Sequence, residues 1–260
     1  MLPIFKFLSG VVLWLDTISS ITLETTPRLL SIQPRAFSPE SQVKMENIMG
    51  CKSWVMLQIG RISALYESKR EMLRREYSDN MNVEFGQSAD RIKRDIQQGI
   101  TEEKVAAISI SDPWSTVDCN PTNLSCTTPH LSCTTTHLFA LAALIYLEAV
   151  STCAHFFGPN EEPAIISEAM MILRTQMPAD MMHAIVCPLF IFGTAAVGED
   201  QQFFRHVFST APVLEPSLVH RRQILPILEE IWGERDACTG TTFWTWQDSL
   251  RVSNGNLILL

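Results

Sequence analysis

A duplicated segment brings together the residue types that bind metal ions. Residues 124–130 are followed directly by a near copy of themselves, 131–137, and each copy contains one cysteine and one histidine. The side chains that zinc could use are Cys126, His130, Cys133 and His137. Because the duplication creates the second pair automatically, and because no two cysteines in the chain are separated by only two residues, we expect no metal site here.

Catalytic chemistry has no recognisable motif in this chain. The sequence contains no G-x-S-x-G turn, no phosphate-binding glycine loop and no H-E-x-x-H pair. One alternative stays open, a helical enzyme whose site is assembled from the dispersed residues His155, Asp180 and His183. Nothing in their spacing makes these residues converge, so we expect no enzyme, no catalytic residue and no cofactor held by this chain.

Adjacent methionines suggest an adaptable apolar surface. Methionine is flexible and fits ligands of varied shape, although at helical positions it more often fills a core. If a pocket for a small apolar ligand exists, we expect its walls to come from Met170, Met171, Phe190, Phe192 and Phe203. Cys187 lies among apolar neighbours, which raise the pKa of a thiol and make it inert.

The composition is that of one folded unit, and we treat residues 1–260 as a single domain. The chain has 260 residues, 46% of them hydrophobic and 18% charged, which provides enough apolar material for a sizeable core and excludes a disordered protein. The formal net charge is -8 and no basic stripe is present, so we expect no non-specific nucleic-acid binding by the chain itself. The seven cysteines are an odd number in a chain too large to need disulfides, which indicates reduced thiols inside a cell.

Helical periodicity dominates the elements that would position these residues. Apolar residues recur every three or four positions between Ile48 and Tyr66, which predicts a long amphipathic helix over 45–77. Further helices are predicted over 89–98, 101–108, 137–157, 163–177, 181–197, 201–211 and 217–235. The fold class we expect is all-α, an irregular array of packed antiparallel helices with one long Ser/Thr/Pro-rich loop.

Local signals mark where these helices should begin and end. Thr101, followed by two glutamates, is typical of a helix N-terminus, and Pro226 predicts a kink or break near Leu225. Residues 109–136 are rich in Ser, Thr, Pro and Asn, which predicts a flexible insertion. We also expect a short element over 244–252 and an apolar tail, 257–260, that docks on the core.

The apolar run at 7–15 raises the question of a membrane segment. No small-x-small cleavage site follows it, and Asp16 comes directly after it, so we interpret the run as part of a core helix. The stretches 138–147 and 184–197 are shorter than the roughly 18–20 residues that a bilayer span needs. We therefore expect no transmembrane helix.

Five segments in chain order resemble a known family. The first is an apolar helix followed by Asp16 and a Ser-Ser-x-Thr run, at 8–22, and the second is an acidic-x-Ile-x-Gly-Cys entry to a long helix, at 46–51. The third is an Ala-x-x-x-Tyr-Leu helix at 137–147. The last two are a Pro-Leu-Phe-Ile-x-Gly motif at 187–193 and a Leu-Glu-x-x-Trp-x-x-Arg-Asp ending at 228–236. Together they resemble the fungal-specific transcription factor domain, found downstream of zinc binuclear cluster DNA-binding regions. Cys187 replaces the tryptophan that is common before the Pro-Leu-Phe-Ile-x-Gly motif.

The resemblance implies an all-helical regulatory domain that works in the nucleus on RNA polymerase II transcription. Its partners would be the transcription machinery or regulatory proteins, and some relatives are thought to respond to small apolar molecules. The N-terminal zinc cluster is absent from residues 1–260. We therefore expect zinc only in a region preceding this chain, and contact with DNA only through such a region or through a partner protein.

Overall fold

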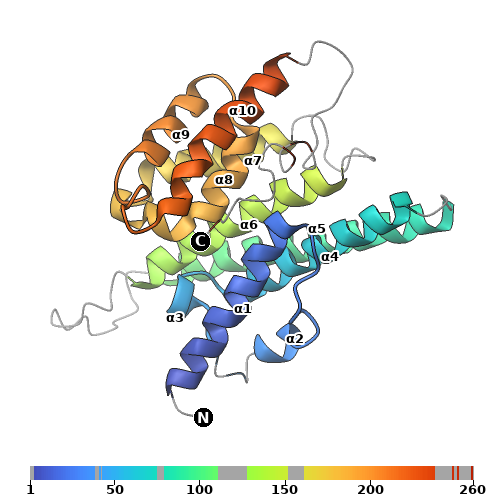
Figure 1. Ribbon diagram of the computed structural model, residues 1–260. Helices are drawn as coiled ribbons and strands as arrows, with labels where there is room; N and C mark the ends of the chain where they lie inside the picture. Colours follow the sequence, from blue (N-terminus) through green and yellow to red (C-terminus); the bar gives the residue numbers. More distant parts are fainter. Residues whose placement is uncertain are drawn as a thin grey trace.

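The computed structural model shows a helical protein built around one central helix (Figure 1). No strand occurs among the residues that the structure describes, as the all-α prediction requires. These residues are 3–38, 41, 43–74, 79–110, 128–151, 161–237, 248, 251 and 259.

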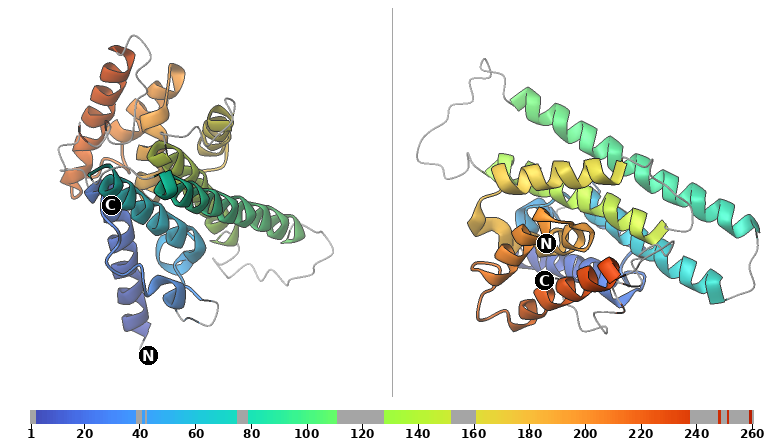
Figure 2. Two further views of the ribbon diagram at one scale, coloured as in Figure 1. Left: turned by 90° about the vertical axis from the view of Figure 1, so that its right-hand side faces the viewer. Right: turned by 90° about the horizontal axis from the view of Figure 1, so that it is seen from above.

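Three long helices form the middle of the molecule. They are α4 (Ser53–Arg74), α5 (Asp79–Ile110) and α6 (Thr128–Ser151). Each packs against the other two, and α5 runs in the opposite direction to α4 and α6 (Figure 2). The helices are therefore held as one compact trio rather than as separate hairpins.

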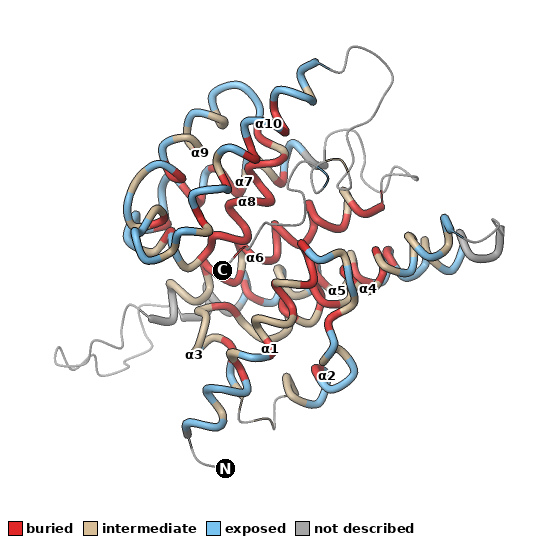
Figure 3. Tube along the Cα trace, viewed as in Figure 1, coloured by how far each residue is buried: buried red, intermediate tan, exposed pale blue. Residues whose placement is uncertain are grey.

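The central helix α6 is buried almost along its whole length (Figure 3). All side chains from Leu138 to Leu147 are buried, because nine of these ten residues are aliphatic or phenylalanine and the tenth, Tyr146, has a hydroxyl partner. The Tyr146 hydroxyl oxygen lies 3.3 Å from the hydroxyl oxygen of Ser63 in α4. The Ser63 hydroxyl also accepts a hydrogen bond from the Ser20 hydroxyl at 2.9 Å. A helix that is apolar on every face can only be the core of such an array.

The N-terminal helices cover one side of this trio. The long helix α1 (Pro3–Leu23) packs on α4 through its second half, and α2 (Gln33–Ala36) and α3 (Glu46–Met49) are single turns beside it. Asp16 fixes the chain after α1, since its carboxylate accepts the backbone N–H groups of Arg28 at 3.1 Å and Leu29 at 2.8 Å.

The C-terminal helices cover the opposite side of α6. They are α7 (Glu161–Thr175), η2 (Ala179–Ile185), α8 (Val186–Ala195), α9 (Glu199–Ser209), η3 (Val219–Gln223) and α10 (Ile224–Ala237). The apolar helix α8 lies innermost, packed between α6 and the outer helices α9 and α10. Trp232 of α10 donates its indole N–H to the Gly193 carbonyl of α8 at 2.8 Å, which ties the outer layer to the inner one.

Several boundaries differ from those predicted. Residues 128–136 of the predicted insertion are helical, because Thr134, Thr135 and Thr136 are buried against neighbouring helices and the packing outweighs their low helix propensity. The predicted helices 89–98 and 101–108 are one helix, in which Thr101 donates to the Gln97 carbonyl at 2.8 Å instead of capping a new N-terminus. Residues 111–127 of the insertion lie outside the described residues.

The predicted helix over 45–77 is interrupted near its start. Gly50 adopts a φ of 69°, a left-handed conformation that ends α3 and that glycine adopts without strain. The break near Leu225 occurs as predicted, since η3 gives way to α10 at Ile224 and Pro226 lies in the first turn of that helix. In the tail, Leu259 is buried; the element 244–252 lies largely outside the described residues.

Two helices are longer and more apolar than the sequence prediction assumed. Ile4–Leu23 and Leu131–Ser151 are both long enough to cross a membrane by length and composition. For the second, 78% of the most apolar window is buried inside the protein, which is typical of a core helix. For the first the buried share is 33%, so the interpretation of the run at 7–15 as core is wrong for its beginning, where Phe7 and Leu8 are exposed.

Two glycines of α5 provide a matched test of this packing. A Cβ atom added to Gly99 would lie 2.5 Å from the Trp54 ring of α4, whereas one added to Gly86 would meet nothing within 4 Å. We predict that Gly99→Ala lowers the free energy of unfolding by about 1–3 kcal/mol through overpacking. Gly86→Ala should raise it by about 0.5–1 kcal/mol, because alanine favours the helix. Urea unfolding of both variants measures the difference, and equal effects would contradict the close α4–α5 contact.

Candidate functional site

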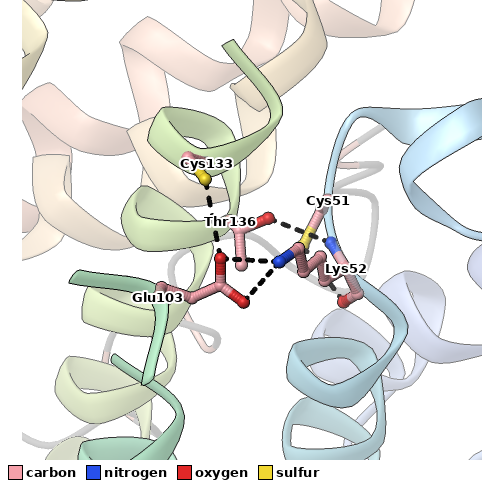
Figure 4. Close-up of polar contacts among 5 residues, drawn as sticks. All are labelled: Cys51, Lys52, Glu103, Cys133 and Thr136. Atoms are coloured by element: carbon pink, nitrogen blue, oxygen red, sulfur yellow. Dashed lines mark hydrogen bonds and ion pairs between the residues drawn. The ribbon is translucent and has the colours of Figure 1, made fainter. Parts of the chain in front are cut away.

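A partly buried ion pair joins α5 to the turn just before α4 (Figure 4). The Lys52 ammonium group donates to both carboxylate oxygens of Glu103, each at 2.8 Å. Glu103 of α5 is only 9% exposed, whereas the Lys52 side chain is 36% exposed. The carboxylate therefore depends on this lysine more than the lysine depends on it.

Neighbouring polar groups complete this cluster, which we call the polar junction: Cys51, Lys52, Glu103, Cys133 and Thr136. The Thr136 hydroxyl accepts the backbone N–H of Lys52 at 3.0 Å, and the Cys133 thiol donates to Glu103 at 3.6 Å. Figure 4 shows these side chains converging from α5, α6 and the turn before α4. The duplicated segment thus supplies hydrogen-bond partners to the junction.

The thiols of the polar junction are not poised for nucleophilic chemistry. Burial raises the pKa of Cys51, and the nearby carboxylates of Glu46 and Glu103 raise it further. Burial likewise raises the pKa of Cys133, with Glu103 adding to the effect and Lys52 opposing it. Cys187 is also fully buried, and burial raises its pKa as the sequence predicted. Thiols held in the neutral form act here as small packing groups.

The possible zinc ligands do not assemble among the residues that the structure describes. Cys133 contacts Glu103, and the imidazole Nε2 of His137 lies 3.0 Å from Glu168 Oε1. Burial lowers the pKa of His137 although Glu168 opposes the shift. No group of three His, Cys, Asp or Glu side chains able to hold a metal ion occurs in the described part. Cys126 and the side chain of His130 lie outside that part, so the absence of zinc stays a prediction.

The residues of the enzyme alternative do not form a catalytic arrangement in the described structure. His183 contacts the main-chain carbonyl of Asp180 through Nδ1 at 2.6 Å, within the short helix η2. Both residues are exposed, and His155 lies outside the described residues. The ring is held to the backbone of its own turn, not to a carboxylate that could share its proton.

The five residues predicted to line a pocket are distributed between core and surface. Phe190 and Phe192 are fully buried in α8, and Met170 is buried in α7. Met171 is 49% exposed, because adjacent residues of a helix point in different directions. Phe203 is half-buried, in a T-shaped ring pair with Phe204 and with the guanidinium of Arg174 over its face. None of the five lines either cavity described below, and whether they bind a ligand stays a prediction.

A cavity of about 440 Å³ lies instead where α1, α3, α6, η2 and η3 meet. Apolar residues form most of its wall, among them Ile48, Met49, Leu131, Phe139 and Met181. Its polar lining includes Trp14, Glu46, Thr135, His183 and Arg221. We call this space the central cavity.

Arg221 and Trp14 are two polar side chains in the wall of the central cavity. Arg221 is 6% exposed and donates from Nη2 to the His183 carbonyl at 3.2 Å. Burial lowers the pKa of Arg221, with Glu215 opposing the shift. The indole Nε1 of Trp14 is buried, and it makes no hydrogen bond within the described part of the chain.

A second, shallower space of about 780 Å³ runs between α1 and α2. Its walls include the exposed apolar residues Phe5, Leu8, Val12 and Ile32. We call it the α1–α2 groove. The early turns of α1 therefore line this groove and are not part of the core.

Comparison with known proteins identifies the family. The family model described as "Fungal specific transcription factor domain" matches residues 3–260. The chain belongs to this family. The fold of the fungal specific transcription factor domain is thus all-helical here, and the family predicted from the five motifs is confirmed.

Three curated relatives of this fungal specific transcription factor domain carry names as regulators. "Pestheic acid cluster transcriptional regulator 3" of Pestalotiopsis fici is 35% identical over 98% of this chain. "Transcription factor dibT" of Pestalotiopsis microspora is 24% identical over 98%, and "Transcription factor ntnD" of Nectria sp is 26% identical over 88%. The chain spans 43%, 41% and 37% of their respective lengths. No solved structure matches the chain.

The motifs that carry the family resemblance are packing elements in this domain. The segment 187–193 is the buried helix α8, and the segment 228–236 belongs to α10. The Trp232 hydrogen bond to Gly193 joins these two motifs directly, and Arg235 donates to the Thr194 carbonyl at 2.8 Å. The segment 46–51 ends at the turn that leads Lys52 into the polar junction.

Sequence reasoning missed the residues that the geometry singles out. Glu103 was one of two glutamates in the first turn of the predicted helix 101–108, a position typical of exposed residues, so nothing local indicated its burial. Trp14 and Arg221 come from segments more than 200 residues apart, and nothing local marks their meeting.

Because Glu103 is more deeply buried than Lys52, we predict that removing the two charges one at a time lowers stability by different amounts. Lys52→Met should cost about 3 kcal/mol of unfolding free energy, because it leaves a buried carboxylate without its cation. Glu103→Gln should cost only about 1 kcal/mol, because the lysine can still reach water.

The double variant Lys52→Met with Glu103→Leu should recover most of the loss, since it removes both charges together. Chemical denaturation of the three variants measures these differences. Equal losses from the two single changes, with no recovery in the double variant, would contradict the buried pair.

Proposed function

We propose that this chain is the regulatory and interaction domain of a fungal transcription regulator. The observation that carries the proposal is the 35% identity to "Pestheic acid cluster transcriptional regulator 3" over 98% of the chain. Similarity over the whole folded unit, rather than over one motif, supports a shared role for the domain. The regulator would act in the nucleus on RNA polymerase II transcription, and its target genes would form a cluster.

The charge of the chain supports a role in protein contacts rather than in reading DNA. Its formal net charge is -8, whereas proteins that neutralise phosphates present lysine and arginine along one face. DNA contact would therefore come from another region of the regulator or from a partner protein. Any zinc would belong to that DNA-reading part.

An acidic surface on α10 provides the proposed point of contact. Glu229, Glu230, Glu234 and Asp236 are all exposed on this helix, while its apolar residues face α8 and α9. Complementary charge speeds encounter and selects partners more than it adds affinity. The partner we propose is a protein of the transcription machinery, or a regulatory protein, with a basic surface.

Catalysis is not part of the proposal. The buried thiols are held neutral, and His183 is bonded to a main-chain carbonyl. The relatives' names describe regulators and no reaction. These observations support a binding function in preference to the enzyme alternative.

A reporter assay tests the proposal with the full 260-residue chain fused to an unrelated DNA-binding domain. At equal protein abundance, we expect the fusion to raise or lower reporter transcription at least fivefold relative to the DNA-binding domain alone. Reversal of charge on α10 by Glu230→Lys and Glu234→Lys together should remove most of that change.

The matched control reverses two exposed acidic residues on α5, through Glu84→Lys and Asp90→Lys, and should leave the change intact. A folded fusion that behaves like the DNA-binding domain alone would overturn the regulatory role. A regulatory effect that the α10 variant retains would overturn the acidic surface as its site.

A further inference from the structure

The first half of α1 carries an exposed apolar surface (Figure 3). Of the large apolar side chains that are exposed in the described part of the chain, about half belong to this helix. Phe5, Leu8 and Val12 are 55%, 49% and 51% exposed, and their spacing of three and four positions makes them one stripe along the helix. Contiguous exposed apolar residues mark interaction sites, whereas scattered ones do not.

This stripe forms one wall of the α1–α2 groove. The facing wall comes from the segment 29–43, in which Leu29, Ile32 and Val43 line the same space of about 780 Å³. The groove is therefore an apolar depression between two parts of the chain. Such grooves receive the apolar face of a helix, whose side chains at i, i+3, i+4 and i+7 enter the depression.

Basic residues accompany the apolar walls of the groove. Arg35 is the one charged residue among the described residues that line it. Lys6, Arg28 and Lys44 are next to lining residues in the chain, and Arg28, Arg35 and Lys44 are exposed. None of these four basic side chains forms an ion pair with another residue that the structure describes.

The described acidic residues of the same region are engaged elsewhere. The carboxylate of Asp16 accepts two backbone N–H groups, and Glu24 pairs with Arg70 at 2.7 Å. Glu46 lines the central cavity, and Glu40 lies outside the described residues. The described surroundings of the groove are therefore positive, in a chain whose formal net charge is -8.

This local positive charge argues against two occupants of the groove. A two-fold contact between copies of the chain would place the same basic residues against one another, which disfavours a dimer through this face. The acidic helix α10 of a second copy has no apolar face to offer, because Ile227, Leu228 and Ile231 are buried in its own fold. A flat bilayer surface would leave the depression between α1 and α2 unfilled.

We propose that the α1–α2 groove binds an acidic amphipathic helix of another protein. Apolar side chains on one face of that helix pack against Phe5, Leu8 and Val12, and carboxylates beside them meet Arg35 and its basic neighbours. This contact is opposite in charge to the one proposed for α10. It goes beyond the regulatory role and does not depend on it, so failure of the reporter assay would leave it standing.

Two synthetic peptides that differ only in charge test the proposal on the full chain. Both have leucine and phenylalanine at helical positions i, i+3, i+4 and i+7, and the remaining positions are glutamate in one and lysine in the other. We expect the glutamate peptide to bind at one site per chain, at least tenfold more tightly than the lysine peptide, by fluorescence anisotropy at physiological salt. The net charge of the chain by itself favours the lysine peptide, so this preference reports the local charge around the groove.

Matched substitutions locate the binding site. Val12→Asp should weaken the glutamate peptide at least tenfold, whereas Val219→Asp, at an exposed valine of η3, should change its affinity less than twofold. Arg35→Glu should weaken it at least fivefold, and Arg91→Glu, at an exposed arginine of α5, less than twofold. Circular dichroism and a cooperative melting transition confirm that each variant is folded.

Three peptide results would overturn the proposal. The folded wild-type chain could fail to bind the glutamate peptide, it could bind both peptides equally, or binding could survive both Val12→Asp and Arg35→Glu. If Val12→Asp does not fold, Ile32→Glu takes its place, since Ile32 is exposed and lines the same groove.

Two further measurements distinguish the other occupants. Sedimentation should show the same mass for the wild-type chain and Val12→Asp, and a wild-type dimer that this change dissociates would assign the groove to a second copy. Vesicles of phosphatidylcholine and phosphatidylserine should not bind the wild-type chain. Vesicle binding that Val12→Asp abolishes would assign the face to a membrane, and either result would overturn the proposal.

Discussion

Burial of α6 is the constraint on which the rest of this domain depends. A helix that is apolar on all faces can leave water only if other helices surround it. Full burial of one Leu, Ile or Phe side chain contributes about 1.5–3 kcal/mol, and such residues occupy most positions between Leu138 and Leu147. α4 and α5 cover one side of α6, and α7 and α8 cover the other. Both layers therefore bury the same helix.

Buried polar groups fix the register of α4, α5 and α6, which apolar packing alone would specify less tightly. The hydroxyl of Tyr146 has to find a partner inside the core, and Ser63 of α4 provides it. At the other end of the trio, the polar junction satisfies Thr136, Lys52 and Glu103 together. Each contact is made only when α4, α5 and α6 lie in this register, because a shift would leave a buried carboxylate or hydroxyl without a partner.

The sequence predicted most of the helices and the family, but it did not predict which residues from distant segments lie close together. Local periodicity predicted the late helices because their apolar faces are continuous, and the break at Pro226 followed from the geometry of proline. Composition failed at residues 128–136, where threonines typical of a loop are buried in a helix and Thr136 accepts the backbone N–H of Lys52. The central cavity was unpredictable from local pattern, since residues that line it, Trp14 and Arg221 among them, come from segments far apart in the chain.

Hydrogen–deuterium exchange on the folded chain tests the central role of α6 most directly. Amides from Leu138 to Leu147 should exchange only through global unfolding, with the same dependence on denaturant as the whole protein. The amides of residues 4–8, at the start of α1, should exchange directly or by local opening at much lower cost. Exchange of the α6 amides through local opening, at rates like those of residues 4–8, would contradict the account of one unit folded around this helix.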